Sequence, residues 1–293
     1  MRLAAPARLS AHPTLALVAI ADTGNDRVVI AGLDGCVLGV IEDVARPYGV
    51  RFTTNGAIVC EAARARVVHV GLDYVAPSGR LLVDSGPRTV VIDGLAAPTD
   101  CVLEADGTVL VANPAGPTIV AVDANGDTTV VAGSPGRAAH VDGPPRASRT
   151  VGPVGLAAAP QGTFVVDRDA HALRILSPTR LLATLIGRGP AHPGFADGPV
   201  ATASFQHPSG VVAAPDGASA YIADTGNDAL RLWSGVDGEV MTVPLPLGAL
   251  AAPSDLDLLP DGRLIVADTG HDRVVIVDLR RGAVETLVLE DSR

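Results

Sequence analysis

Six polar residues stand at matching places in the sequence and could act together on a ligand. Each lies within two residues of a proline that opens an apolar segment: Arg46, Tyr48, Asp100, His207, Ser209 and Asp255. An arginine can bind an anion, hydroxyl and imidazole groups can bind a carbonyl group, and His207 is a candidate general base. The carboxylates of Asp100 and Asp255 beside His207 would also suit a divalent cation, calcium or zinc.

A structural role is the alternative for several of these residues. Asp100 and Asp255 would then accept backbone amides at the start of a strand, and Ser209 would close a turn, as short polar side chains commonly do. His207 alone would be a rim residue. The choice depends on whether the fold brings the prolines together.

The prolines mark a repeat. They are Pro6, Pro47, Pro98, Pro153, Pro208 and Pro253, at spacings of 41, 51, 55, 55 and 45 residues, and are called the leading prolines below. About fifteen residues after a leading proline comes a second marker, an eight-residue segment called the octad. Its clearest copies begin Ala-Asp-Thr-Gly at Ala21, Ala223 and Ala267, and fainter copies lie at Cys60, Ala112 and Val166.

Each octad stands between two apolar alternating runs, which indicates strand, tight turn, strand. The octad aspartates Asp22, Asp224 and Asp268 are tempting as a calcium-binding carboxylate ring. We interpret them instead as structural turn caps, whose side chains accept amides across a turn in which glycine supplies the positive φ. Glu61 and Asn113 at the equivalent positions weaken the case for a metal ring.

Turns such as Asp106-Gly107, Asp216-Gly217 and Asp261-Gly262 complete four strands per repeat. Six such units predict an all-β fold, a six-bladed β-propeller of four-stranded antiparallel blades forming one domain over residues 1–293. The expected blades are approximately 3–43, 44–94, 95–133, 134–187, 188–247 and 248–293. We expect the ring to close by apolar packing between the terminal blades and not by a shared strand.

The leading prolines and octad turns should share one face, called the upper face. It would carry the longer loops, 132–151 and 187–207, and is therefore the expected binding surface. The six polar residues named above would then surround the upper mouth of a central channel.

The octads and the Pro-Ser-Gly-Val of residues 208–211 resemble the NHL-repeat family of β-propellers. The segment Phe195-Ala196-Asp197-Gly198-Pro199 is similar to that of NHL propellers fused to thioredoxin-like domains, and residues 141–144 form a degenerate copy. This resemblance spans essentially the whole chain. It implies a six-bladed fold but no single activity, since the family includes protein-binding, RNA-binding and enzymatic members.

Composition excludes several functions. All 22 basic residues are arginine, which removes Schiff-base chemistry and a phosphate-loop lysine. The net charge of −10 argues against nucleic acid as a partner. Three widely spaced cysteines indicate a reducing, cytoplasmic location, and no apolar run is long enough for the membrane. Abundant Ala, Gly, Arg and Val suggest a bacterial genome, and we expect a monomer.

Two functions follow. The first is a binding module that presents its upper face to a protein or small-molecule ligand, with cationic or peptide partners suited to the acidic surface. The second is a propeller enzyme, a metal-assisted lyase or hydrolase of the lactonase, lyase or synthase kind, with its site at the mouth of the channel.

Overall fold

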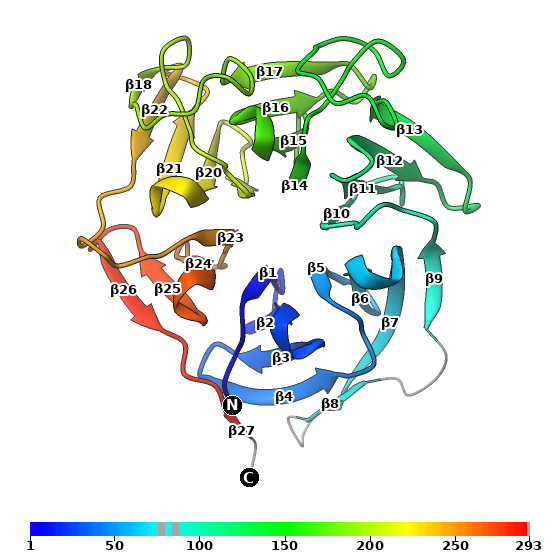
Figure 1. The fold of residues 1–293 in the computed structure, drawn as a ribbon. Coiled ribbons are helices and arrows are strands. Elements are labelled where there is room, and N and C mark those ends of the chain that lie inside the picture. Colours follow the sequence, from blue (N-terminus) through cyan, green and yellow to red (C-terminus); the bar gives the residue numbers. More distant parts are fainter. Residues whose placement is uncertain (76–79, 84–87, 292–293) are drawn as a thin grey trace.

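Alternating apolar residues and tight turns fold each sequence repeat into one antiparallel sheet. In the computed structural model six such sheets surround a central axis, so the prediction of an all-β six-bladed propeller is confirmed (Figure 1). The structure describes residues 1–75, 80–83 and 88–291. In this part of the chain no helix is long and apolar enough to cross a membrane.

The strands run outward from the axis in sequence order within each blade. Blade 1 consists of β1 (Pro6–Ala11), β2 (Leu17–Asp22), β3 (Arg27–Gly32) and β4 (Cys36–Ile41). Blade 2 consists of β5 (Pro47–Thr53), β6 (Gly56–Glu61), β7 (Arg66–Val75) and β9 (Thr89–Ile92), with β8 (Arg80–Val83) also paired to β7. Blade 3 consists of β10 (Asp100–Leu103), β11 (Val109–Asn113), β12 (Thr118–Val122) and β13 (Thr128–Gly133).

The other three blades follow the same plan. Blade 4 consists of β14 (Pro153–Ala159), β15 (Gly162–Asp167), β16 (Ala172–Leu176) and β17 (Leu182–Ile186). Blade 5 consists of β19 (Gly210–Ala213), β20 (Ser219–Asp224), β21 (Ala229–Ser234) and β22 (Glu239–Thr242), with β18 (Gly198–Pro199) on its outer edge. Blade 6 consists of β23 (Pro253–Leu258), β24 (Leu264–Asp268), β25 (Arg273–Asp278) and β26 (Ala283–Thr286).

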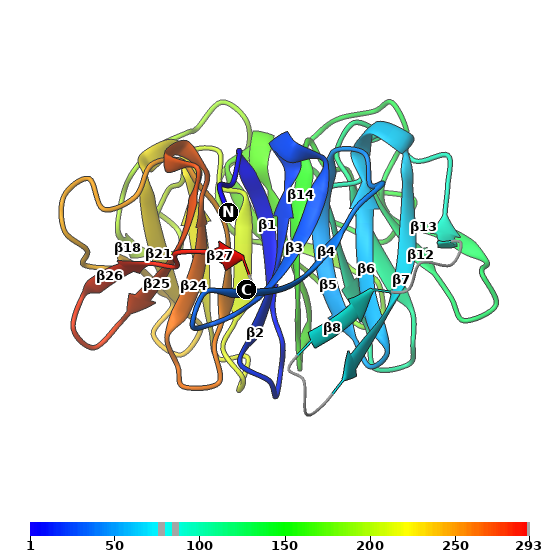
Figure 2. The ribbon, with the colours of Figure 1, turned by 90° about the horizontal axis from the view of Figure 1, so that it is seen from below.

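Short 3-10 turns join the second and third strands of five blades. They are η1 (Thr23–Asn25), η2 (Ala62–Arg64), η3 (Arg168–Ala170), η4 (Thr225–Asn227) and η5 (Thr269–His271). These octad turns lie at one end of the ring, drawn uppermost in Figure 2, and the hairpins between the first and second strands lie at the other. The upper face is therefore the one that carries the octad turns.

The core is divided among the junctions between blades. Successive residues of a strand point to opposite faces of the sheet, so Val18 and Ile20 pack toward blade 6 while Ala19 and Ala21 pack toward blade 2. Buried apolar clusters of this kind lie between every pair of neighbouring blades. Each blade is thus stabilised by both of its neighbours, which requires a closed ring.

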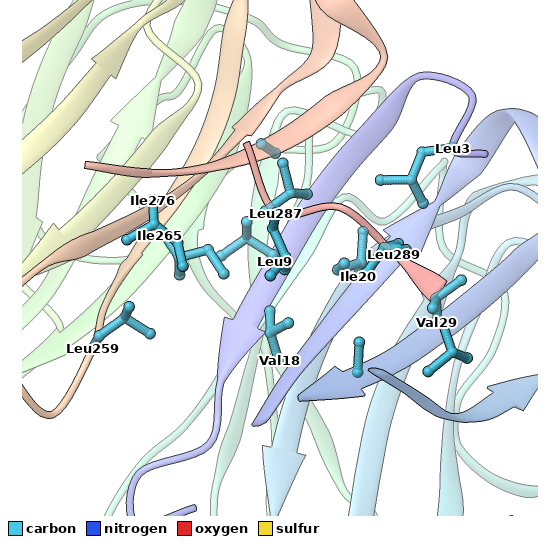
Figure 3. Close-up of a cluster of buried hydrophobic side chains, with 14 residues drawn as sticks. Leu3, Leu9, Val18, Ile20, Val29, Leu259, Ile265, Ile276, Leu287 and Leu289 are labelled. Atoms are coloured by element: carbon cyan, nitrogen blue, oxygen red, sulfur yellow. The ribbon is translucent and has the colours of Figure 1, made fainter. Parts of the chain in front are cut away.

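Closure combines packing with strand pairing. Figure 3 shows Leu9 and Ile20 of blade 1 near Ile265 and Ile276 of blade 6, in the apolar cluster that we expected. However, the end of the chain also forms β27 (Glu290–Asp291), which pairs in parallel with β4 of blade 1. The expectation that no strand is shared was wrong, because the chain beyond β26 crosses to the first blade and buries Leu289 there.

The two long loops do not rise over the channel. Figure 1 shows them at the outer edge of blades 4 and 5, where β18 pairs with β22 and Gly143 pairs with Leu182 of β17. The reason is a buried arginine in the third strand of blade 4 and another in the third strand of blade 5. Arg231 Nη2 lies 2.6 Å from Asp197 of the Phe-Ala-Asp-Gly-Pro segment, and Arg174 Nη2 lies 2.8 Å from Asp142 of its degenerate copy. Only the end of the second loop, at His207, reaches the cavity at the upper mouth.

The octad aspartates accept backbone amides, but not those of their own turns as we expected. Asp22, Asp224 and Asp268 are fully buried, and each accepts a backbone amide that lies two residues ahead of the leading proline of its blade. The positive φ falls on Asp26, Asp228 and Asp272 and not on the glycines. Glycine is required for another reason: a Cβ atom at Gly270 would lie 2.7 Å from the carbonyl oxygen of Ala251.

Candidate functional site

The innermost strands place charged side chains in the central channel. Arg8, Asp100 and Asp255 each stand two residues after a leading proline, and Arg51 and Asp257 stand four residues after one. Alternate residues of a strand share a face, so these positions form two successive layers around the axis. Glycine occupies the first layer in the other three blades. A Cβ atom at Gly155 would lie 3.4 Å from the Arg8 guanidinium nitrogens, so glycine leaves room for that side chain.

Arg8 closes the channel. Its side chain is 3% exposed, and its Nη1 lies 2.9 Å from Asp255 and 3.6 Å from Asp100, both of which are fully buried. Its Nη2 donates to the carbonyl oxygens of Val154 and Ser209, at 2.5 and 2.8 Å. One side chain of blade 1 thus joins blades 3, 4, 5 and 6 across the axis.

Arg51 forms the next layer from blade 2. Its Nη2 lies 3.0 Å from the Asp100 carboxylate, and its Nη1 donates to the carbonyl oxygen of Leu9 at 3.0 Å. Burial would lower the pKa of Arg51, but the carboxylates of Asp100, Asp255 and Asp257 outweigh it and raise the pKa above its usual value. Arg51 therefore stays charged.

The carboxylates of the channel outnumber the guanidinium groups. Asp100, Asp255 and Asp257 face Arg8 and Arg51, so full ionisation leaves one negative charge in excess. Burial raises the pKa of Asp255 to about 6, against the lowering effect of the two arginines. Burial raises the pKa of the half-buried Asp257 as well, although the amides of Ala11 and Leu258 donate to its carboxylate.

The structure therefore separates the six residues that the sequence grouped together. Asp100 and Asp255 lie beneath the floor of the mouth and bind arginines, where the Arg8 guanidinium takes the place that a metal ion would need. In the described part of the chain no group of three or more His, Cys, Asp or Glu side chains is arranged to hold a metal ion. Arg46, Tyr48, His207 and Ser209 do line one common cavity, which is described next.

The cavity opens at the upper mouth of the channel and has a volume of about 610 Å³. Arg8 forms part of its floor. Small apolar side chains form much of its wall, among them Ala7, Ala62, Ala97 and Val154. Arg168 and Asp169 of η3 also line the cavity and form an ion pair at 3.0 Å.

One half of this mouth is held together by hydroxyl groups. The octad threonines Thr23, Thr225 and Thr269 each donate to the carbonyl oxygen of the leading proline of the next blade, at 2.6 to 2.7 Å. Ser209 belongs to this half, because its hydroxyl contacts Thr225 and donates to the carbonyl oxygen of Ser254 at 2.9 Å. Ser209 is thus engaged in joining blades 5 and 6.

The other half departs from the repeat, and two of its polar groups have no partner in the described part of the chain. Ala62, Pro114 and Arg168 replace the octad threonine in blades 2, 3 and 4. Arg46 is exposed, and among the described residues its guanidinium has no carboxylate partner; the half-buried Tyr48 hydroxyl also has no hydrogen-bond partner there. The backbone of Arg46 is held at φ 46° by the Asp26 carboxylate, which accepts its amide at 2.7 Å.

His207 borders the same half. Its backbone is also left-handed, and its amide donates to Nδ1 of His171 at 3.0 Å while the two rings meet edge to face. Burial lowers the pKa of His171, which favours the neutral ring that this bond requires. His207 itself is exposed and lines the cavity.

Sequence reasoning overlooked Arg8, Arg51 and the Arg168 and Asp169 pair. A signal for Arg8 was present, because it stands at the same distance from its leading proline as Asp100 and Asp255 do. An arginine among glycines and aspartates on inner strands indicates an ion pair across the axis. Arg168 could have been found as the one charged residue that replaces an octad threonine.

The fold and this mouth define a six-bladed β-propeller with a polar, arginine-sealed channel. No family model matches the chain. The protein SUPPRESSOR OF QUENCHING 1, chloroplastic, of Arabidopsis thaliana is 32% identical over 135 residues, which cover 44% of this chain and 12% of that protein. The chain thus matches a small part of that relative.

Solved structures share the fold at low sequence identity. A streptogramin B lyase structure matches with a TM-score of 0.62 at 9% identity, covering 100% of this chain and 85% of that one. A chain of a nidogen and laminin complex matches with a TM-score of 0.66 at 12% identity, covering 90% of each chain. The propeller fold is therefore shared with a lyase and with a protein that forms a complex.

Proposed function

We propose that this chain is an NHL-type propeller that binds a small organic acid at its upper mouth. The observation that carries the proposal is that the Arg46 guanidinium, which has no carboxylate partner among the described residues, and Tyr48 line one cavity with small apolar walls. A carboxylate could accept from both groups, and its carbon skeleton would contact Ala62, Ala97 and Val154. The octads and the Pro-Ser-Gly-Val segment support the NHL assignment.

The charge of the mouth supports an anion. The chain carries a net charge of −10. Yet Arg46 and Arg168 stand at the cavity with Asp169 as the acidic partner of Arg168. Among the described residues Arg46 has no carboxylate partner, so at this mouth we propose an anion and not the cationic partner that the acidic surface suggests. An anion drawn to Arg46 would bind less tightly as ionic strength rises, because salt screens exposed charges.

The test is calorimetric titration with a panel of small carboxylic acids and their neutral amides. We expect binding of an acid and not of its amide. Arg46→Gln should weaken binding about tenfold or more, since a hydrogen bond to a charged group contributes about 1.5–3 kcal/mol. Tyr48→Phe should weaken it by a smaller factor, since a neutral hydrogen bond contributes about 0.5–1.5 kcal/mol.

Arg280→Gln is the matched control, because Arg280 is an exposed arginine between β25 and β26 on the lower face. It should leave the affinity unchanged. Equal effects of the Arg46 and Arg280 substitutions, or equal binding of acid and amide, would refute the proposal.

An enzyme is the second candidate, and the exposed His207 imidazole in the same cavity favours it. Such a lyase or hydrolase would use His207 as a base, with the bound acid oriented by Arg46. Proton NMR of the acid that binds most tightly, followed over hours, distinguishes the two functions. A ligand that is converted, with conversion lost in His207→Gln, would make the chain an enzyme; an unchanged ligand would leave a binding module.

A further inference from the structure

Among the described residues, the junction between blades 2 and 3 lacks a pair of polar links that three other junctions have on the upper face. At three other junctions, an octad threonine and the aspartate three residues after it bind the backbone of the next blade, as Thr269 and Asp272 bind Pro6 and Ala5. In blade 2 these two places hold Ala62 and Ala65, whose side chains cannot form hydrogen bonds. Below the upper face, an apolar cluster holds this junction together with Arg51 of blade 2, which binds Asp100 of blade 3.

Two cysteine side chains meet at this junction. Cys60 lies on β6 and Cys101 on β10, and both are fully buried in the apolar cluster between the two blades. Gly49, which pairs with Cys60, explains how close the strands come. A Cβ atom there would lie 3.0 Å both from Cys60 Sγ and from the Cα atom of Asp100, the residue before Cys101.

We propose that Cys60 and Cys101 form a redox-responsive clasp, which a peroxide closes into a disulfide across the junction of blades 2 and 3. In this step one thiolate attacks hydrogen peroxide and becomes a sulfenic acid, releasing hydroxide. The second sulfur then displaces hydroxide from the first and forms the S–S bond. The two thiols lose two protons and two electrons, and the peroxide is reduced to two molecules of water.

The pKa of the Cys60 thiol sets the conditions for closure. The neighbouring Cys101 thiol and burial both raise this pKa well above its usual value, so little thiolate exists at neutral pH. Oxidation should therefore be slow in the closed junction and faster at high pH or when the blades separate transiently.

The clasp would also reach the floor of the mouth. The carbonyl oxygen of Cys101 accepts a hydrogen bond from Arg51 Nε at 3.2 Å, and the preceding Asp100 binds Arg51 and lies 3.6 Å from Arg8. Movement of β10 on oxidation is thus transmitted to the ion pairs of the channel.

The test treats the full chain with hydrogen peroxide and maps it after tryptic digestion without reductant. We expect peptides 52–64 and 89–137 to be joined, with the loss of two hydrogen atoms in the intact mass. A reductant should reverse the loss. The joined form should melt at a temperature several degrees higher, since a cross-link restricts the unfolded chain.

Cys36 supplies the matched control, because it is the third cysteine and lies on β4 of blade 1. Cys36→Ser should behave like the parent chain, and Cys60→Ser should lose the cross-link and the rise in melting temperature. Recovery of Cys60 and Cys101 as separate thiols or separately oxidised residues would overturn the proposal. The oxidation is repeated in dilute urea, which opens the junction to peroxide. Failure to form the cross-link there as well would complete the refutation.

Discussion

Arg8 illustrates how one residue can hold a repeat protein together. This one side chain of blade 1 contacts four other blades. Its partners are Asp100 of blade 3, Val154 of blade 4, Ser209 of blade 5 and Asp255 of blade 6. Its partners are buried, so its guanidinium must stay paired, because an isolated buried charge is strongly unfavourable. The arginine therefore serves as the fixed cation of the channel and as the floor of the mouth.

Asp255 should make stability depend on pH. Its pKa is about 6 in the folded protein and about 3.8 in the unfolded chain. The folded protein keeps this proton while the unfolded chain releases it, so rising pH makes folding less favourable between about pH 4 and 6. Asp255→Asn removes the effect. The free energy of unfolding of the parent chain minus that of the variant, from urea titrations, should fall across this range and be constant above it.

Asp127→Asn is the control for this experiment, since Asp127 is exposed in a turn of blade 3. It should leave the pH profile of the parent chain unchanged. A difference between the parent chain and Asp255→Asn that is flat from pH 4 to 7 would contradict the raised pKa.

At the scale of elements, the third strands of blades 4 and 5 do more than pair with their neighbours. Arg231 on β21 is fully buried and binds Asp224, Asp197 and the carbonyl oxygens of Ala196 and Ser204. Its guanidinium lies 4.8 Å from the ring centre of Phe195 and 5.3 Å from that of Phe205. This strand thereby holds the long loop before it against the edge of the sheet.

Arg231→Lys should release that loop, because an ammonium group cannot reproduce the planar set of hydrogen bonds. We expect the free energy of unfolding to fall by about 3 kcal/mol or more, since breaking a buried ion pair is costly. Chymotrypsin should cleave faster beside Phe195. Arg263→Lys, at an exposed pair with Asp261, should change stability by about 1 kcal/mol or less. Equal losses in the two variants would contradict this account of the loop.

At the scale of the whole molecule, ring closure should be the main source of cooperativity. The cluster between blades 6 and 1 contains Leu287 and Leu289, which lie in the segment between β26 and β27. β27 then pairs with β4 of blade 1. Asp272 of blade 6 also accepts the amide of Ala5 in blade 1 at 2.7 Å. Packing, strand pairing and a polar link therefore act together at one junction.

Leu289→Ala tests the apolar part of closure. Removing a buried leucine should lower the free energy of unfolding by about 2–5 kcal/mol, measured by urea titration. Leu247→Ala is the control, because Leu247 is fully exposed and should have almost no effect. If both substitutions leave stability unchanged, closure does not depend on this cluster.

Much of the fold could be predicted because its signals are local. Apolar alternation and Asp-Gly turns specify a four-stranded unit within about 50 residues, and six copies leave a ring as the arrangement that buries every sheet face. The leading proline and the octad recur at a nearly constant separation because the proline pairs directly with the octad acid. Pro6 pairs with Asp22, and Pro253 pairs with Asp268. The same repeat also predicted that four polar residues meet at one mouth, namely Arg46, Tyr48, His207 and Ser209.

The sequence could not show which charges meet. Arg8 and Asp255 are 247 residues apart, and both stand at positions that local rules assign equally well to a solvated mouth or to strand caps. Only the closed ring brings inner strands from opposite sides close enough for a guanidinium to span the axis. The course of the long loops was hidden for a similar reason, because a buried arginine on a later strand fixes each of them. Repetition along the chain determined the architecture, while contacts across the ring decided the site.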